Sequence, residues 1–207
     1  MQHLRPNPTP RRALATAAMA ALLFAAPLAA QEEGADEATP AAPEIAGLET
    51  FEVDSAAHTE DDVDYPQDPP AGGPHNPVWQ SCGFYEAPVR PEHAVHSQEH
   101  GAVWITFRPG LPERELTLLE RLVERNEYVL VSPYPEQAEP VVVSAWGAQV
   151  RLEEATDERL RAFVRAYAGN GPERGAPCDG GTDETLALLA ASPVASPVAS
   201  PVASPSA

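Results

Sequence analysis

The sequence contains no lysine. All 13 of its basic residues are arginine, and they face 31 acidic residues, which gives a net charge of −18 at pH 7. Aromatic residues are also scarce, at 6% of the 207 positions. A protein that neutralises a phosphate backbone needs clustered basic side chains, so this charge balance argues against a nucleic-acid partner. No apolar run after residue 30 is long enough to span a bilayer, so no transmembrane span is expected in the mature chain.

Residues 1–30 have the layout of a signal peptide. Three arginines and no acidic residue precede an apolar run over residues 13–30, and acidic residues follow it. Cleavage after Ala30 would leave 10 basic and 31 acidic residues, a net charge of −21. We therefore expect an exported protein of the cell envelope, periplasmic or extracellular. An uncleaved anchor helix is the alternative.

Only two cysteines occur, Cys82 and Cys178. In an exported protein such a pair is expected to form a disulfide, because the compartment is oxidising. The bridge would close a loop of nearly a hundred residues, which is worth about 4–5 kcal/mol if it acts by restricting the unfolded chain. The alternative, a thiolate metal site, has no CxxC spacing to support it.

The composition changes along the chain and predicts four segments. After the signal peptide (1–30), residues 31–43 are acidic and rich in Pro and Ala, and they are expected to form a disordered linker. Residues 44–178 are expected to be globular. The tail, 179–207, is of low complexity and ends in repeats of Ala-Ser-Pro-Val.

The globular segment predicts an α+β fold, with a small sheet and helices packed on one face. Its first half is loop-rich: residues 48–53 favour a strand, but 65–77 hold too many Pro and Gly for regular structure. The second half reads strand, helix, strand, strand, helix. Residue patterns place these strands at 102–108, 128–132 and 141–146, with a continuation at 150–152. They place the helices from Pro112 to Asn126 and from an N-cap at Thr156 to Gly169.

Histidine placement is the strongest indication of chemistry. Five of the six histidines lie within residues 58–100, and imidazole is a common ligand of borderline metals. Residues 91–101 have the Pro-first, Gly-last asymmetry of a short helix. On that helix His93, His96 and His100 would lie within an arc of about 60°. His96 and His100 share a face in a strand as well, so they are the preferred ligands.

His75 ends a loop in which several prolines and a Gly-Gly pair fix the backbone, and such a loop can hold one ligand in place. His58 is a fourth candidate by its proximity in sequence, and Glu99 is another. Together these residues predict a site for Zn²⁺ or Cu²⁺, both of which accept nitrogen and oxygen donors. The mature chain would hold no Met, which argues against a Cu⁺ carrier.

Three runs in this region resemble a known family: VDYPQDPPAGGPHNP at 63–77, CGFY at 82–85 and VHSQEHGAV at 95–103. They are similar to a bacterial family catalogued as domain of unknown function 3105, with its PPxGGxH and VHxxEHG signatures. The resemblance extends from about His58 to Cys178. It implies an exported or membrane-tethered protein, and it favours His96 and His100 over His93. It implies no particular activity.

Three functions are compatible with these residues. The first is a non-enzymatic metal-binding protein that uses His75, His96 and His100 with His58 or Glu99. The second is a zinc hydrolase, because residues 96–100 fit the pattern H-x-x-E-H, in which Glu99 would activate a water molecule. The third is a disulfide-stapled interaction module of the cell envelope without a metal. The three tryptophans, Trp79, Trp104 and Trp146, are expected to lie in the core or in a satellite cluster beside it, rather than to form a ligand platform.

Overall fold

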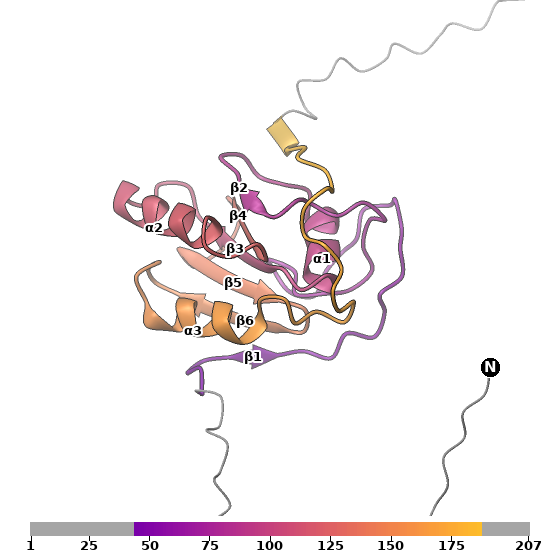
Figure 1. The fold of residues 1–207 in the computed structure, drawn as a ribbon, viewed down its shortest axis with the longest axis horizontal. Coiled ribbons are helices and arrows are strands. Elements are labelled where there is room, and N and C mark those ends of the chain that lie inside the picture. Colours follow the sequence, from indigo (N-terminus) through magenta and orange to yellow (C-terminus); the bar gives the residue numbers. More distant parts are fainter. Residues whose placement is uncertain (1–43, 188–207) are drawn as a thin grey trace, which may run out of the picture. The chain divides into compact units, whose positions relative to one another are not determined.

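The computed structural model describes residues 44–187, which form a six-stranded mixed sheet with three helices (Figure 1). The α+β prediction is confirmed. The strands are β1 (Glu49–Thr50), β2 (Gly83–Phe84), β3 (Val103–Phe107), β4 (Val129–Pro133), β5 (Val141–Ala145) and β6 (Ala148–Leu152). The helices are α1 (Pro91–Glu99), α2 (Glu113–Val123) and α3 (Glu158–Tyr167). The expected signal peptide, the linker and the tail from residue 188 lie outside the described residues.

The sheet has the strand order β1-β6-β5-β3-β4-β2. Strands β3 and β4 pair in parallel, because α2 carries the chain back between them. β5 and β6 form an antiparallel hairpin, and Gly147 in its turn has a φ of +71°, which favours glycine. The short strands β1 and β2 extend the sheet at its two edges.

One face of the sheet is apolar and is covered by α2 and α3. Alternate residues of the strands, such as Val103 and Ile105 of β3, share a buried cluster with Leu119 of α2 and Phe163 of α3. All four are fully buried. The prediction that helices pack on one face is confirmed for these two helices.

Helix α1 packs on the opposite face, so the one-face prediction does not extend to it. Trp104 points away from the α2/α3 cluster and packs with Ala94 of α1 and with Leu130. The other residues that alternate onto this face are largely polar, among them Ser132, Ser144 and Gln149. This second face therefore uses hydrogen bonds as well as apolar contacts to hold α1 and the loop segments that cover it.

Helix α3 begins one residue later than the sequence pattern indicates. Its N-cap is Asp157, whose carboxylate accepts a hydrogen bond from the backbone N–H of Arg159. The Arg159 guanidinium also bonds this carboxylate and is the main cause of the lowered pKa of Asp157. Thr156 was expected to cap the helix, but the longer reach of Asp157 into the first turn, with a charge that suits the helix dipole, takes that role.

After α3 the chain runs to the end of α1 as an irregular segment, residues 168–178, here called the strap (Figure 1). Gly169 N–H donates to Gly101 O at 2.9 Å, and Glu173 N–H donates to Glu99 O at 3.0 Å, so the strap lies along the C-terminal end of α1. The strap ends at Cys178, which forms the predicted disulfide with Cys82.

Contacts with the body continue beyond Cys178. Thr182 exchanges backbone hydrogen bonds with Trp79 and Ser81, and Leu186 N–H donates to Pro88 O. The first residues of the expected tail therefore lie against the folded body. Among residues 44–187, no helix combines the length and the apolar character needed to cross a membrane.

Candidate metal centre

Four histidines gather at α1, on the side of the sheet away from α2 and α3. His96 is central: its ring centroid lies 4.8 Å from that of His75, 5.0 Å from that of His58 and 4.6 Å from that of His100. His75, His96 and His100 are buried, whereas the side chain of His58 is 51% exposed. The structure thus brings together all four histidines that the sequence analysis proposed.

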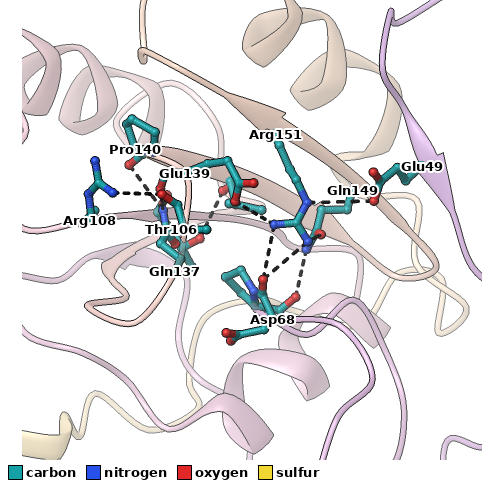
Figure 2. Close-up of polar contacts among 12 residues, drawn as sticks. Glu49, Asp68, Thr106, Arg108, Gln137, Glu139, Pro140, Gln149 and Arg151 are labelled. Atoms are coloured by element: carbon teal, nitrogen blue, oxygen red, sulfur yellow. Dashed lines mark hydrogen bonds and ion pairs between the residues drawn. The ribbon is translucent and has the colours of Figure 1, made fainter.

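His75 belongs to the proline loop, residues 66–77, whose first part is fixed to the sheet. Figure 2 shows Arg151 of β6 reaching the carbonyl oxygen of Asp68 while it also binds Glu139 at 2.8 Å. The neighbouring Gln149 donates its side-chain N–H to Pro69 O at 2.9 Å. In the same view Gln137 bonds backbone oxygens of the segment that carries Glu139. The polar face of the sheet therefore holds the start of the loop.

The second part of the proline loop lies against α1. Gln98 donates to Pro70 O at 3.0 Å, and Asn76 N–H donates to Glu92 O at 3.2 Å. Gly72 has a φ of +113°, and a Cβ atom there would lie 2.8 Å from Val53, so only glycine fits this turn without displacement. The consequence is that His75 points at the helix rather than at solvent.

His58 reaches the cluster by pairing with the loop. A short parallel bridge joins the segments of His58 and His75: His75 N–H donates to Ala57 O at 3.0 Å, and Thr59 N–H donates to His75 O at 2.7 Å. Sequence proximity was the only argument for His58. The structure gives a physical reason, since the bridge brings the two imidazoles together, with 5.0 Å between their ring centroids.

His96 and His100 come from α1, as predicted. They lie one turn apart, His100 is the C-cap, and Gly101 follows with a φ of +105°. A Cβ atom on Gly101 would lie 2.9 Å from the backbone of Gly169, so the glycine lets the strap approach the end of the helix. The same approach places Glu173 beside His100, with 3.4 Å between its carboxylate and His100 Nε2.

The three buried histidines share one hydrogen-bonding arrangement. Each Nδ1 lies 2.7–2.8 Å from a backbone carbonyl oxygen: Gly73 for His75, Asn76 for His96 and Pro177 for His100. A carbonyl oxygen only accepts hydrogen bonds, so Nδ1 carries the ring proton and Nε2 of the neutral ring has a free lone pair. Histidines that bind metals are usually oriented by this kind of contact.

The contact between His75 and Glu99 lacks the hydrogen bond that its short distance would suggest. His75 Nε2 is fully buried without a hydrogen-bond partner, yet it lies 3.1 Å from a carboxylate oxygen of Glu99. Because Nδ1 already holds the proton of the neutral ring, a lone pair faces a negatively charged oxygen. Either a cation lies between these atoms or the ring takes a second proton and pairs with Glu99.

Burial keeps the central histidine neutral. It lowers the pKa of His96 to about 4, with the neighbouring histidines acting in the same direction and the hydrogen bond to Asn76 opposing them. A neutral imidazole is the form that binds a metal ion. His96 is therefore ready to act as a ligand at neutral pH without first losing a proton.

The donor atoms fall into two groups that share His96. The His75 group contains His58, His75, His96 and Glu99, and the His100 group contains His96, His100 and Glu173. Within each group one ligand atom per residue lies within 4.8 Å of the others. The sequence predicts His75, His96 and His100 around one ion, whereas the structure puts His75 and His100 in different groups. His93, on the same helix, belongs to neither group.

Glu173 is the residue that sequence reasoning missed. It lies in the strap, more than seventy positions after His100, and no local pattern marks it as a ligand. The disulfide of Cys178 was the only signal that this segment returns to the front of the domain. Trp79 and Trp146 also differ from expectation, because they lie beside the histidine rings, whereas Trp104 lies in the core as predicted.

Comparison with known proteins gives one match. A family model described as a protein of unknown function (DUF3105) matches residues 57–180, which is more than half of the chain and contains both histidine groups. No curated protein and no solved structure matches. The fold and the candidate centre therefore have to be interpreted from their own chemistry.

Proposed function

The chain belongs to the DUF3105 family of proteins of unknown function, and from the arrangement of its histidines we propose that it is an exported, non-enzymatic metal-binding protein. The ion is Zn²⁺ or Cu²⁺, and its ligands are the four members of the His75 group. Export rests on the signal-like residues 1–30 and agrees with a chain in which both cysteines are paired, as is usual outside the cytoplasm.

The observation that carries this proposal is the contact between His75 and Glu99. Two electron-pair donors 3.1 Å apart, one of them fully buried, repel each other unless a positive charge lies between them. A divalent cation supplies that charge and uses both atoms as ligands. His96 and His58 then complete four donors, the number that Zn²⁺ prefers in closed sites.

The donor types restrict the ion. Three imidazoles and a carboxylate suit Zn²⁺ and Cu²⁺, whereas Cu⁺ favours sulfur, and the two cysteines are already joined in a disulfide. The net charge of −18 raises the local concentration of cations. Neither argument separates Zn²⁺ from Cu²⁺, so both are tested.

A hydrolase is supported less well by this geometry. The pattern H-x-x-E-H requires His96 and His100 on one zinc ion with Glu99 free to act as a base. In the structure His96 and His100 do fall together, with Glu173, in the His100 group, but Glu99 contacts His75 and is itself a candidate ligand of the His75 group, so it is not free to act as a base. We therefore assign Glu99 to binding.

The experiment measures metal content and affinity for the full chain, produced with its disulfide intact. Elemental analysis and equilibrium dialysis with Zn²⁺ and with Cu²⁺ are expected to give a retained ion for the wild type. His75→Gln and His96→Gln are expected to weaken binding at least tenfold. His93→Gln is the matched control, because His93 lies on the same helix outside both groups, and it is expected to bind like the wild type.

Absence of binding by the wild type would contradict the proposal and favour the third function, a metal-free interaction module in which a protonated His75 pairs with Glu99. Equal binding by the wild type and by His75→Gln would also contradict it, because the ion would then sit elsewhere.

A further inference from the structure

His96 is the only residue common to both groups, and its hydrogen bond limits what it can do. Nδ1 is occupied by the contact with Asn76 O at 2.7 Å, so a single lone pair, on Nε2, is available. One lone pair binds one ion at a time. The His75 group and the His100 group therefore cannot both be complete at once, although their donors lie side by side.

The two groups differ in the number and exposure of their donors. The His75 group has four donors, and its carboxylate, Glu99, is 12% exposed. The His100 group has three donors, and its carboxylate, Glu173, is 60% exposed. The larger number of donors makes the His75 group the tighter site, whereas Glu173, the more exposed of the two carboxylates, is the one that a cation arriving from solvent meets first.

From this arrangement we propose that the His100 group is a second metal position, which captures the ion and passes it to the His75 group through His96. This inference rests on the proposed function. The ion first binds Glu173, His100 and His96. It then exchanges Glu173 and His100 for Glu99, His75 and His58, while His96 Nε2 stays bound throughout.

The exchange is balanced in charge. Each position offers one carboxylate beside its imidazoles, so the ion leaves one negative charge and meets another. The rings of His96 and His100 are 4.6 Å apart between centroids and 84° apart in orientation. Trp79 packs against both rings, with its ring centroid 4.9 Å from that of His100 and 5.7 Å from that of His96.

The strap fixes the capturing position in place. Glu173 N–H is bonded to Glu99 O, and Pro177 O accepts the proton of His100 Nδ1. The second contact orients a ligand of the His100 group, whereas the first joins the strap to the backbone of Glu99, a member of the His75 group. A substitution of the Glu173 side chain removes neither contact, so the capturing position can be perturbed while the strap stays attached.

The test follows Cu²⁺ loading of the full chain by stopped-flow quenching of tryptophan fluorescence, since Trp79 lies against two ligand rings. Equilibrium dialysis gives the stoichiometry and the Kd. The wild type is expected to bind one ion. Glu173→Gln is expected to slow loading at least tenfold and release equally, with a Kd within twofold of the wild type. Asp179→Asn removes an exposed carboxylate just after the strap and is expected to load like the wild type.

His75→Gln is expected to load as fast as the wild type, because the His100 group is intact, but to release the ion at least tenfold faster. Two ions per wild-type chain, or unchanged loading in Glu173→Gln, would overturn the transfer and leave the metal-binding proposal standing. A Glu173→Gln variant that loads slowly only because its Kd rises in proportion would overturn it as well. Absence of any binding of Cu²⁺ and of Zn²⁺ in equilibrium dialysis would refute the proposed function itself.

Discussion

Replacing Glu99 by Gln tests whether Glu99 is a metal ligand or one half of an ion pair with His75. The two interpretations predict changes of opposite sign in the free energy of unfolding of the metal-free protein. The substitution keeps the shape of the side chain and exchanges an acceptor oxygen for an amide that can donate. In the metal-free protein this amide can donate to His75 Nε2, which lies 3.1 Å from the carboxylate and has no hydrogen-bond partner. A hydrogen bond of this kind is worth about 0.5–1.5 kcal/mol, so we expect the metal-free variant to be at least as stable as the wild type.

If His75 were instead protonated and paired with Glu99, the same substitution would leave a buried charge without its partner. That loss costs about 3–5 kcal/mol. The two interpretations then differ by about 5 kcal/mol in the free energy of unfolding, which urea titration resolves. The measurement is made with a chelator present and the disulfide intact, and the exposed Glu120→Gln of α2 is the control for loss of a carboxylate.

Adding Zn²⁺ completes the experiment. At a concentration of one hundred times its Kd, an ion that binds only the folded state raises the free energy of unfolding by about 2.7 kcal/mol. If Glu99→Gln weakens binding tenfold, the gain at the same concentration falls to about 1.4 kcal/mol. A metal-free variant that loses several kcal/mol, with no response of the wild type to Zn²⁺, would refute the reasoning.

Three further predictions concern the frame of the site. Asp157→Ala is expected to lower the free energy of unfolding by about 1 kcal/mol, whereas Thr156→Ala has little effect. Because the folded-state pKa of Asp157 is lowered, its contribution to stability is present above the usual Asp pKa and is lost as the pH falls through the lowered value. The free energies of unfolding from urea titrations at pH 7 and pH 3 should therefore differ less for Asp157→Ala than for the wild type. Replacing Cys82 and Cys178 by Ser is expected to lower the free energy of unfolding by about 4–5 kcal/mol. It is also expected to slow Cu²⁺ loading, since the freed strap no longer orients the His100 group, while the Kd stays close to that of the wild type. An unchanged loading rate would contradict this role of the strap. Gly101→Ala introduces a Cβ atom at a φ of +105° and 2.9 Å from the backbone of the strap. Limited proteolysis is expected to cut the strap of this variant faster than that of the wild type. Equal cleavage rates would show that the strap does not depend on this close approach.

Much of the candidate site could be predicted because its determinants are local. His96 and His100 share a side of α1 through helix geometry alone, and the proline loop is rigid through its own residues. His93 shares the same helix arc, yet it stays outside both groups. Helical spacing selects a face, but it does not determine which part of that face meets other segments of the chain.

The sequence by itself determined the main elements and the disulfide. Strands such as β3 and β4 follow from local runs of β-branched residues, helices from their spacing of apolar residues, and the bridge from the presence of only two cysteines. Only the tertiary structure decided that α1 covers the face opposite α2 and α3, that His58 pairs with His75, and that Glu173 returns to His100. These three features arise from backbone hydrogen bonds and packing between segments far apart in the sequence. The energies of such contacts depend on the whole fold and not on any local pattern.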